Sequence, residues 1–466
     1  MKASIFKAYD IRGLSPGELD AQDAKRIGQA IAKVLKIKHV VVGKDVRSTS
    51  DELERELVEG LLSQGVSVTR IGLCSTPLFN FAIGSSKGTY DAGVMVTASH
   101  NPPAYNGFKI TLGNNIPVGQ GNGMEEIRGV AFSPQSIPPA DTRGESRKDN
   151  TVLQRYIDYV LKEFDAPAEM PKTRIAVDAG NGMDGIVLPE IKKALPNIDW
   201  LELYWEPDGG FPNHEANPLK TETLSNLSTK VVQENCLFGA AFDGDGDRVG
   251  FVDEKGEVVP GDIMTALLAT EILKKYPGAR ILYDLRSSWS VPETIEKLGG
   301  IAEMSRVGHA FIKRSMKETG AVFAGEVSMH LYFKNFWNCE SGDYAMLLLL
   351  KILLKEQVPF SKLWKSFQLY SHSHELNFSV PDAKSVLKTF ASTYKAQATD
   401  ISHLDGIRME FRDKKEPEQD WWFSLRASNT EPLVRLNLEA KNDARMNEKK
   451  AELIKLIKSL GGTEKL

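Results

Sequence analysis

Three aspartates recur at every second position in the stretch AAFDGDGDRVGFVD. They are Asp243, Asp245 and Asp247, and single glycines separate them. In an extended chain, side chains two positions apart lie on the same face, so the three carboxylates would point the same way. Like charges this close repel each other unless a cation lies among them, and hard oxygen ligands select Mg²⁺ or Ca²⁺. The pattern therefore predicts a divalent-cation site.

Two alternatives account for the same stretch. An EF-hand loop would have an acid at position twelve, where Glu254 stands, but it needs glycine at position six, where the chain has Arg248. The flanking residues also resemble strands rather than helices. The second alternative is an acidic turn exposed to solvent. A strand rarely exposes three aspartates in series without a use, so we favour the cation site.

A glycine-rich stretch, AGNGMDG, follows a predicted strand and precedes a predicted helix. Gly180, Gly182 and Gly185 have the spacing G-x-G-x-x-G, and an acid, Glu206, follows about 20 residues later. Dinucleotide-binding turns occur in this context. A structural glycine turn at a helix N-terminus fits the same residues, and the spacing alone leaves both interpretations open.

A third cluster lies in LRASNTEPLVR, where two guanidinium groups accompany several short polar side chains. Small polar residues in a turn also present backbone N–H groups, which together bind anions. The stretch therefore indicates a phosphate clamp, and a capped helix start or turn with solvated arginines is the alternative. The residues concerned are Arg426, Ser428, Asn429, Thr430 and Arg435.

The stretch VMVTASHNPPAYNGFKI ends a predicted strand with a serine and a histidine. Adjacent residues of an extended chain point to opposite faces, so we expect that Ser99 and His100 do not hydrogen-bond as a nucleophile and its base. Ser99 also lies outside any G-x-S-x-G elbow. An exposed serine can instead carry a phosphoryl group, whose charge beside three aspartates would require Mg²⁺. A serine in an ordinary turn is the alternative.

The elements that must position these residues alternate between short β-branched runs and longer helical patterns. Predicted strands cover residues 39–43, 67–72 and 91–97. A predicted helix over 50–65 lies between the first two, with Ser50 as its N-cap and Gly65 as its stop. This alternation predicts βαβ units and a mixed or parallel sheet.

The same pattern restarts twice further along the chain. It restarts at 173–185, after a Pro-rich and charged stretch over 134–150, and again at 278–288. From about residue 370 the runs GIRMEFR, WWFSLRAS and LVRLNLEA predict antiparallel strands, and a helix follows them. The sequence therefore predicts an α/β protein with three similar mixed-sheet α/β domains and a smaller α+β C-terminal domain.

Composition excludes several classes of function. The 466 residues carry a net charge of −4, which gives no bulk attraction to nucleic acid or acidic membranes. The start, MKASIFKAYDIRG, lacks the apolar core of a signal peptide. The longest apolar run, YAMLLLLKILL, contains Lys351, is shorter than the ~20 residues of a membrane span, and predicts a buried helix. Three scattered cysteines fit a reducing compartment, so we expect a cytoplasmic protein.

The motifs TASHNP, DGDGDR and RASNTEP, in this order, resemble those of the α-D-phosphohexomutases, the family of phosphoglucomutases and phosphomannomutases. KAYDIRG, GKDVR, VDAGNG, RVGH and GEVSMH extend the resemblance over essentially the whole chain. It implies four domains around a central cleft, and it makes AGNGMDG a structural turn rather than an NAD site. The implied domains are 1–146 with the phosphoserine loop, 147–252 with the metal loop, 253–368 with the sugar loop and 369–466 with the phosphate loop.

The resemblance implies an enzyme that moves phosphate between O1 and O6 of glucose or mannose, through a phosphoserine and a hexose 1,6-bisphosphate. Mg²⁺ is the implied cofactor, and glucose 1,6-bisphosphate is the implied activator and intermediate. Phosphosugars are the expected partners of a monomer that binds neither nucleic acid nor membranes. Enzymes that act on glucosamine phosphate usually carry a different sugar loop.

The resemblance also assigns roles to single residues. The implied metal ligands are Ser99, Asp243, Asp245 and Asp247. The implied catalytic residues are Ser99, Arg12, His100, Lys109, Arg248, Arg286 and His309; of these, Lys109, His309 and Arg286 are the candidate bases, and His100 is expected to support the serine loop. The implied sugar-binding residues are Tyr9, Arg306, Gly308, Glu326, Ser328 and His330. The implied phosphate-binding residues are Arg426, Ser428, Asn429, Thr430 and Arg435.

Two positions depart from the family pattern. The sugar loop reads GEVSMH where G-E-M-S-G-H is common, and Val307 stands where threonine is common. Glu326, Ser328 and His330 are in place, so we expect the main hydroxyl contacts to survive.

Two rival hypotheses are an oxidoreductase built on the glycine-rich turn and a non-catalytic Ca²⁺-binding protein built on DGDGD.

Overall fold

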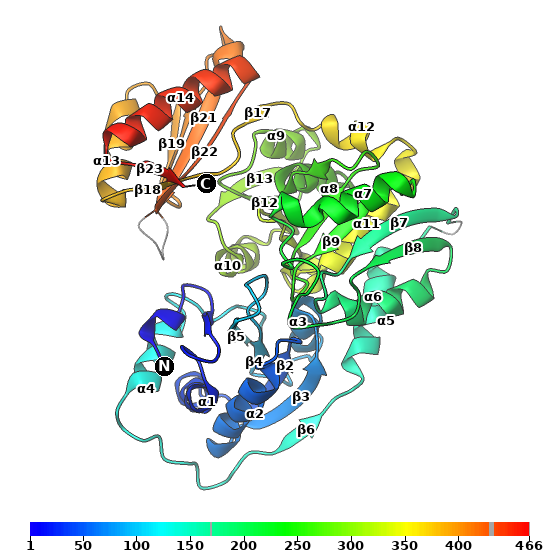
Figure 1. The fold of residues 1–466 in the computed structure, drawn as a ribbon, viewed down its shortest axis with the longest axis vertical. Coiled ribbons are helices and arrows are strands. Elements are labelled where there is room, and N and C mark those ends of the chain that lie inside the picture. Colours follow the sequence, from blue (N-terminus) through cyan, green and yellow to red (C-terminus); the bar gives the residue numbers. More distant parts are fainter. Residues whose placement is uncertain (168–169, 428–432, 466) are drawn as a thin grey trace. The chain divides into compact units, whose positions relative to one another are not determined.

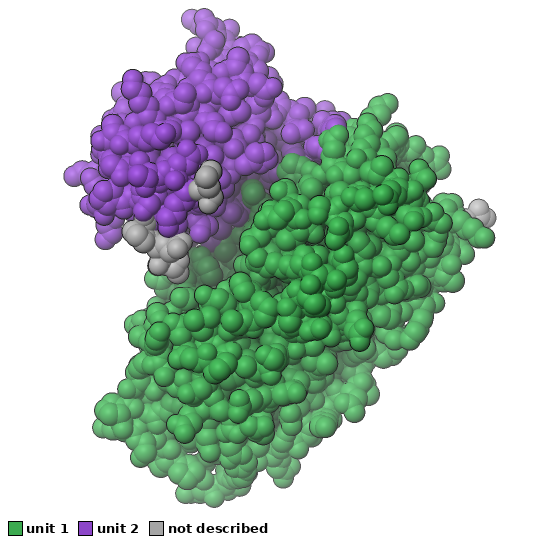
Figure 2. All heavy atoms as spheres, in the orientation of Figure 1, with its two compact units in different colours: residues 1–261, 308–363 green, residues 262–307, 364–466 purple. Residues whose placement is uncertain are grey.

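The computed structural model describes residues 1–167, 170–427 and 433–465, which form two compact units (Figures 1 and 2). Unit 1 comprises Met1–Gly261 and Gly308–Leu363, and unit 2 comprises Asp262–Val307 and Trp364–Leu466. Each unit therefore combines two separate stretches of the chain.

The first sheet of unit 1 has six strands in the order β1-β5-β4-β2-β3-β6. β2 pairs in parallel with β3 and β4, whereas β5 runs antiparallel to β4 and β1, so the sheet is mixed. The strands are β1 (Ile11–Leu14), β2 (His39–Lys44), β3 (Ser67–Leu73), β4 (Ala92–Val96), β5 (Tyr105–Leu112) and β6 (Ser146–Lys148). The helices of this part are α1 (Ala21–Leu35), α2 (Ser50–Ser63), α3 (Thr76–Gly84) and α4 (Met124–Phe132).

The three strands and the helix predicted for this part are confirmed. The helix start differs by one residue, because Thr49 is the N-cap of α2 and Ser50 is its first residue. The Ser50 hydroxyl donates a hydrogen bond to Asp45 Oδ1 instead of capping the helix. Gly65 follows the helix end with a φ of 77°, as expected of a stop.

The second sheet of unit 1 has five strands in the order β11-β10-β9-β7-β8. β7 pairs in parallel with β8 and β9, and β9, β10 and β11 continue as antiparallel neighbours. The DGDGD stretch is therefore the turn of the β9–β10 hairpin. The elements are β7 (Thr173–Asp178), β8 (Ile198–Leu203), β9 (Gly239–Phe242), β10 (Val249–Val252), β11 (Val258–Val259), α5 (Val152–Phe164), α6 (Asp184–Ala194) and α7 (Ser225–Gln233).

The rest of unit 1 contains an antiparallel set of short strands and two helices. β14 (Phe323–Gly325) pairs with β15 (Leu331–Phe333), which pairs with β16 (Cys339–Glu340). The helices are α10 (His309–Thr319) and α11 (Gly342–Glu356), and most residues of α11 are buried, which confirms the predicted buried helix. Within the described residues, we find no helix with the length and hydropathy that a membrane crossing requires.

Unit 2 begins with α8 (Gly261–Lys275), whose first residue still belongs to unit 1. β12 (Arg280–Asp284) and β13 (Ile301–Ser305) then pair in parallel, and α9 (Ser290–Lys297) connects them. This is the third βα pattern that the sequence predicts. A short helix, α12 (Phe360–Lys365), spans the second boundary between the units.

A seven-stranded antiparallel sheet completes unit 2, with the order β19-β20-β21-β22-β18-β23 and β17 paired to β22 (Figure 1). It contains the three antiparallel strands predicted from the sequence, as β20, β21 and β22. The elements are β17 (Ser371–His372), β18 (Leu376–Ser379), α13 (Ala383–Tyr394), β19 (Asp400–Ser402), β20 (Ile407–Phe411), β21 (Trp421–Ala427), β22 (Leu433–Ala440), α14 (Asp443–Ser459) and β23 (Thr463–Lys465).

The two faces of this sheet differ sharply in polarity. Cross-strand partners such as Met409, Phe423 and Leu438 lie on one face, which packs with α13 and α14 into a hydrophobic core. Side chains alternate between faces along a strand, so the intervening residues lie on the opposite face. Those residues are polar or amphipathic: Arg408, Glu410, Trp422, Ser424, Arg426, Arg435, Asn437 and Glu439.

The segment before α9 covers part of this polar face. The Trp289 backbone N–H donates to Glu439 Oε1 at 2.9 Å, and the Trp422 indole N–H donates to the same oxygen at 2.8 Å. The Arg408 guanidinium lies over the Trp422 ring and donates to the Leu285 carbonyl at 2.6 Å. Burial raises the pKa of Glu439 to about 7, although its hydrogen-bond donors lower it.

This raised pKa makes the stability of unit 2 depend on pH. The folded protein keeps the Glu439 proton up to pH ~7, whereas the unfolded chain releases it near 4.5. The contribution is therefore fully present below pH ~4.5 and is lost as the pH rises through ~7. We expect the free energy of unfolding of the wild type to fall by roughly 1–3 kcal/mol between pH 5 and 8 from this group.

Denaturant titrations at pH 5 and pH 8 measure the effect. Glu439→Gln should remove this part of the decrease, while Glu464→Gln, at an exposed position of β23, should keep it. The same decrease in all three proteins would contradict the assignment to Glu439.

Candidate active site

The serine loop leaves the end of β4 and reverses direction at Ser99. Ser99 has a φ of 52°, in the left-handed region that few non-glycine residues adopt, and its side chain is buried. Its hydroxyl donates to Asp243 Oδ2 at 2.8 Å and lies 3.3 Å from His100 Nδ1. The expectation that Ser99 and His100 point apart is therefore wrong. It assumed an extended backbone, and Ser99 is not extended.

Arg47, the last residue of the GKDVR motif, holds the serine loop in this shape, a role that the motif did not indicate. Its guanidinium is buried and donates to the backbone carbonyls of Ser99 (2.6 Å), Asn101 (2.7 Å), Pro102 (2.8 Å) and Tyr105 (3.0 Å). Asp45 pairs with its Nε at 3.1 Å. A planar group with five N–H donors can serve several carbonyls at once, which an ammonium group cannot do from one position.

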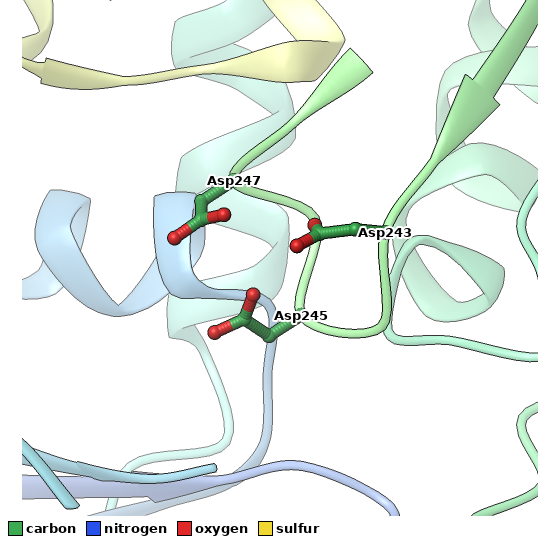
Figure 3. Close-up of side chains that lie close together, drawn as sticks. All are labelled: Asp243, Asp245 and Asp247. Carbon is green, nitrogen blue, oxygen red and sulfur yellow. The ribbon is translucent and has the colours of Figure 1, made fainter. Parts of the chain in front are cut away.

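The three aspartates converge in the β9–β10 turn (Figure 3). One carboxylate oxygen from each of Asp243, Asp245 and Asp247 lies within 4.8 Å of the others, and all three side chains are buried. The predicted convergence is confirmed, but its expected cause is wrong, because the residues form a tight turn with Gly246 at a φ of 74° rather than an extended chain. Strands β9 and β10, rather than helices, flank this turn, and Glu254 accepts a hydrogen bond from the Ser361 N–H, so the EF-hand alternative is excluded.

Several donors surround the triad and partly offset its charge. Lys109 Nζ donates to Asp245 Oδ2 at 2.6 Å and to Asp247 Oδ2 at 2.5 Å. The Thr76 hydroxyl, at the start of α3, donates to Asp245 Oδ2 at 2.7 Å. Burial alone would lower the pKa of Lys109, but the two carboxylates raise it above its ordinary value. Lys109 is therefore a fixed positive charge.

The residues of the triad fit a hard divalent cation. Burial and the neighbouring carboxylates of Asp247 and Asp245 raise the pKa of Asp243 to about 8, which reflects uncompensated negative charge. The buried Asp245 Oδ1 accepts no hydrogen bond from the described residues. The triad offers only oxygen ligands, as Mg²⁺ and Ca²⁺ prefer. We therefore infer that the triad can hold a divalent cation.

The glycine-rich turn supports this loop. A Cβ atom at Gly182 would lie 2.9 Å from the Gly244 carbonyl and 3.0 Å from the Asp243 carbonyl. A Cβ atom at Gly185 would lie 1.8 Å from the Trp205 carbonyl. The protein's own backbone therefore fills the space in front of this turn, where a dinucleotide would need to lie, and the turn is structural.

The predicted sugar loop, residues 325–330, is tied to the metal loop. His330 Nε2 lies 3.2 Å from Arg248 Nε and 3.4 Å from Asp247 Oδ1. On its other side, His330 Nδ1 lies 3.0 Å from Ser328 Oγ and 3.2 Å from Glu326 Oε2. The Tyr332 hydroxyl, which no sequence motif indicated, donates to Glu326 Oε2 at 2.6 Å. Glu326, Ser328 and His330 thus form one network.

Met329 occupies a position where the family commonly has glycine. It adopts a φ of 66°, in the region that favours glycine. The Met329 sulfur packs close to Gly250 of β10. The methionine side chain therefore lies against β10, the strand that follows the metal loop.

Tyr9, Gly308 and His309 lie together beside this network. Gly308 donates its N–H to Glu326 Oε1 at 2.9 Å, and a Cβ atom at Gly308 would lie 2.9 Å from the Tyr9 ring. The Tyr9 and His309 rings meet edge to face at 5.6 Å, and the His309 and His330 ring centroids lie 6.5 Å apart. Arg12, in β1, donates to Asn101 Oδ1 of the serine loop at 2.7 Å.

The remaining predicted residues belong to unit 2. Arg426 of β21 and Arg435 of β22 are direct cross-strand partners, and Arg286 Nη1 and Arg426 Nη2 each lie 3.9 Å from the same oxygen of Glu375. Arg306 is exposed in the same unit. Ser428, Asn429 and Thr430 lie outside the described residues.

Comparison with known proteins identifies the family. Models described as phosphoglucomutase/phosphomannomutase match alpha/beta/alpha domain I over residues 3–136, domain II over 154–256, domain III over 260–370 and the C-terminal domain over 375–456. A phosphomannomutase of Methanocaldococcus jannaschii is 42% identical over 463 residues, which cover 98% of each chain. A phosphomannomutase of Vibrio cholerae is 38% identical over 473 residues, which cover 98% of this chain and 99% of the relative.

A solved structure agrees with these relatives. The phosphoglucomutase/phosphomannomutase family protein of Burkholderia thailandensis superposes with a TM-score of 0.88 and 32% identity over the full length of both chains. The chain therefore belongs to the phosphoglucomutase/phosphomannomutase family. It is a hexose phosphate mutase, an isomerase that acts by phosphoryl transfer. The predicted α/β fold class is confirmed as well.

The hydrogen bonds of Arg47 yield a testable expectation. Arg47→Lys keeps the charge but cannot reach four carbonyls at once, so it should lower the free energy of unfolding by roughly 1–3 kcal/mol. It should also lower the rate of hexose phosphate isomerisation at least tenfold, because the Ser99 backbone is no longer held. Denaturant titration and a coupled mutase assay measure the two effects.

Arg55→Lys is the matched control, since Arg55 is an exposed arginine of α2. It should change neither quantity appreciably. A normal rate in Arg47→Lys would show that the serine loop does not depend on this guanidinium.

Proposed function

We propose that this mutase moves a phosphoryl group between O1 and O6 of mannose or glucose phosphate, through phosphorylated Ser99 and a hexose 1,6-bisphosphate. The main support for this proposal is the 2.8 Å hydrogen bond from the Ser99 hydroxyl to Asp243, which places the serine oxygen beside the carboxylate triad. The relatives named phosphomannomutase support mannose phosphate as one substrate.

The proposed reaction consists of two phosphoryl transfers. A hydroxyl oxygen of the bound hexose phosphate attacks the phosphorus on Ser99, and a base takes the hydroxyl proton. The bond from phosphorus to Ser99 Oγ breaks, and Ser99 Oγ takes up a proton. The resulting bisphosphate turns over in the site. Ser99 Oγ then gives up its proton and attacks the other phosphorus, and the bond from that phosphorus to the sugar oxygen breaks. The sugar oxygen takes up the proton held by the base, which restores the phosphoserine and leaves the isomeric monophosphate.

Lys109 and Arg248 supply fixed positive charge to this transfer. The two carboxylates keep Lys109 protonated, so we assign it charge stabilisation rather than proton abstraction. Arg248 Nε lies 3.8 Å from Asp243 Oδ2, next to the serine hydroxyl. Arg286 pairs with Asp284 and is a poor base, because arginine stays protonated in proteins.

His309 is the base that the geometry favours among the three candidates. Burial, together with the charges of Lys313 and Lys109, holds the pKa of His309 well below its ordinary value, so its ring is neutral and can accept a proton. The ring lies between Tyr9 and His330, beside the proposed sugar contacts. His100 Nδ1 is close to Ser99 Oγ, and we assign it the orientation of the serine.

The proposed sugar contacts come from Glu326 and Ser328. The Glu326 carboxylate is fixed by the Gly308 N–H and the Tyr332 hydroxyl, and a fixed carboxylate can accept hydrogen bonds from two neighbouring sugar hydroxyls. For the phosphate that does not react, we propose Arg426 and Arg435 with the flanking Ser428, Asn429 and Thr430. Arginine forks match the geometry of phosphate oxygens.

We assign Mg²⁺ to Asp243, Asp245 and Asp247, with an oxygen on Ser99 as a further ligand. When bound, Mg²⁺ offsets the negative charge of a phosphoryl group during its transfer. Asp245 Oδ1 supports this assignment, because it is a buried carboxylate oxygen without a hydrogen-bond donor among the described residues.

Phosphorylation of Ser99 can be tested directly. Intact mass spectrometry of protein treated with a hexose 1,6-bisphosphate should show the added mass of one phosphoryl group, which Ser99→Ala should lack. Ser85→Ala provides a matched control outside the site and should keep the added mass. Equal phosphorylation of Ser99→Ala and the wild type would place the phosphoryl group elsewhere.

The metal assignment predicts the behaviour of Asp245→Asn. The substitution removes one ligand charge, so it should lower kcat by roughly a thousandfold or more and weaken binding of Mn²⁺, used as a probe, at least tenfold. Calorimetric titration with Mn²⁺ and a coupled assay measure both. The exposed Asp141→Asn is the control and should behave as the wild type. Unchanged Mn²⁺ affinity in Asp245→Asn would exclude Asp245 as a ligand.

A further inference from the structure

Two arginines face each other directly across the end of the β21–β22 pair in unit 2. Arg426 and Arg435 are register partners on the polar face of the sheet. Like charges directly opposite each other in an antiparallel pair destabilise the sheet. An anion beside this pair would relieve the repulsion, and the structure contains one within the same chain.

That anion is the carboxylate of Glu375, which directly precedes β18. Its Oε1 lies 3.4 Å from Arg435 Nη1, and its Oε2 lies 3.9 Å from Arg426 Nη2 and 3.9 Å from Arg286 Nη1. One carboxylate therefore lies among three guanidinium groups. This arrangement involves residues far apart in the sequence, which explains why no motif indicated Glu375.

Glu375 is held loosely compared with the other acid of this cluster. Asp405 Oδ2 accepts a hydrogen bond from Arg426 Nη1 at 2.9 Å, whereas both contacts of Glu375 Oε2 are 3.9 Å long. The buried Glu375 Oε2 accepts no hydrogen bond within the described ranges, and 26% of the side chain is exposed. Asp405 can therefore position Arg426 while Glu375 moves away.

The arginines also have donors to spare. Arg426 Nε and Arg435 Nε are buried, and among the described residues neither donates a hydrogen bond. A phosphate with three oxygens could use these donors together with the groups that now face Glu375. The cluster thus offers more donors than one carboxylate can accept from.

We propose that Glu375 is an internal counter-ion of the phosphate clamp, which occupies the clamp when no phosphate is bound and yields to the phosphate of the substrate. The proposal rests on the proposed function, in which Arg426 and Arg435 bind the phosphate that does not react. Glu375 is then a residue that sets how tightly the clamp holds phosphate, and it takes no part in the chemical step.

Such an exchange suits a reaction whose intermediate must turn over. Each phosphate has to leave the clamp once per cycle. Without Glu375 this departure would leave the facing Arg426 and Arg435 with only Asp405 as a counter-ion among the described residues, which would oppose the departure. Glu375 replaces the departing phosphate, so the departure costs less. Glu375 should therefore weaken binding of phosphate and raise turnover.

Glu375→Gln tests this directly, because it removes the charge and keeps the size. With inorganic phosphate as the probe in calorimetric titrations, the variant should bind about three to ten times more tightly than the wild type. Glu464→Gln, an exposed position of β23, controls for net charge and should match the wild type. In a protein that also carries Arg426→Ala, Glu375→Gln should no longer change the affinity for phosphate. Equal or weaker phosphate binding by Glu375→Gln overturns the proposal.

Steady-state kinetics supply a second measurement that a merely structural role would not reproduce. Glu375→Gln should lower KM and kcat together, because the clamp holds ground state and intermediate more tightly. A higher KM, or kcat lowered with KM unchanged, overturns the proposal. Suppose that Glu375→Gln binds phosphate more tightly than the wild type, but neither protein isomerises mannose or glucose phosphate. The proposed function then fails, while Glu375 stands as the counter-ion of an anion site.

Discussion

Mutual repulsion among the buried carboxylates Asp243, Asp245 and Asp247 is the constraint on which the rest of the site depends. Three carboxylates close together and away from water cannot all stay ionised without positive charge nearby, and the pKa of about 8 for Asp243 expresses that conflict. Lys109 answers it within the protein by bonding two of the three. The cation that we propose would compensate the remaining negative charge. Ser99, whose hydroxyl donates a hydrogen bond to Asp243, lies beside the carboxylate that Lys109 does not reach.

The same principle operates with opposite sign in unit 2. There the arginines Arg286, Arg426 and Arg435 lie close together, and Asp284, Asp405 and Glu375 compensate them. The alternation of the C-terminal strands explains why the two kinds of environment coexist in one sheet: Phe423 and Leu425 enter the core, while Ser424 and Arg426 face the other way. A hydrophobic face fixes the register, and the register then sets Arg426 opposite Arg435.

The sequence predicted the parts of this structure that depend on local pattern. Periodicity and turn residues gave the strands of the first sheet, helix α2 and the C-terminal strands, and the ordered motifs gave the family. Geometry was predicted less well. The convergence of Asp243, Asp245 and Asp247 was expected from an extended chain but arises in a turn, and Ser99 contacts His100 because its backbone is left-handed. Arg47 belongs to the GKDVR motif, but its role depends on carbonyls more than 50 residues away, and Glu375 also acts through partners remote in sequence. Tyr332 acts through Glu326, only six residues away, but no motif includes it.

Lys109 and Glu375 together indicate a common solution to one physical problem. A site that binds and releases highly charged groups needs some counter-charge when no ligand is bound, because like charges without a counter-ion destabilise the fold. The counter-charge must also be incomplete, because permanent pairing would exclude the ligand. A side chain of the opposite sign that compensates only part of the charge satisfies both conditions. Lys109 spans two of three carboxylates and leaves Asp245 Oδ1 without a donor among the described residues, and Glu375 contacts three arginines and leaves two Nε donors unused. In both places the unused polar atoms are those that an incoming charged group would need.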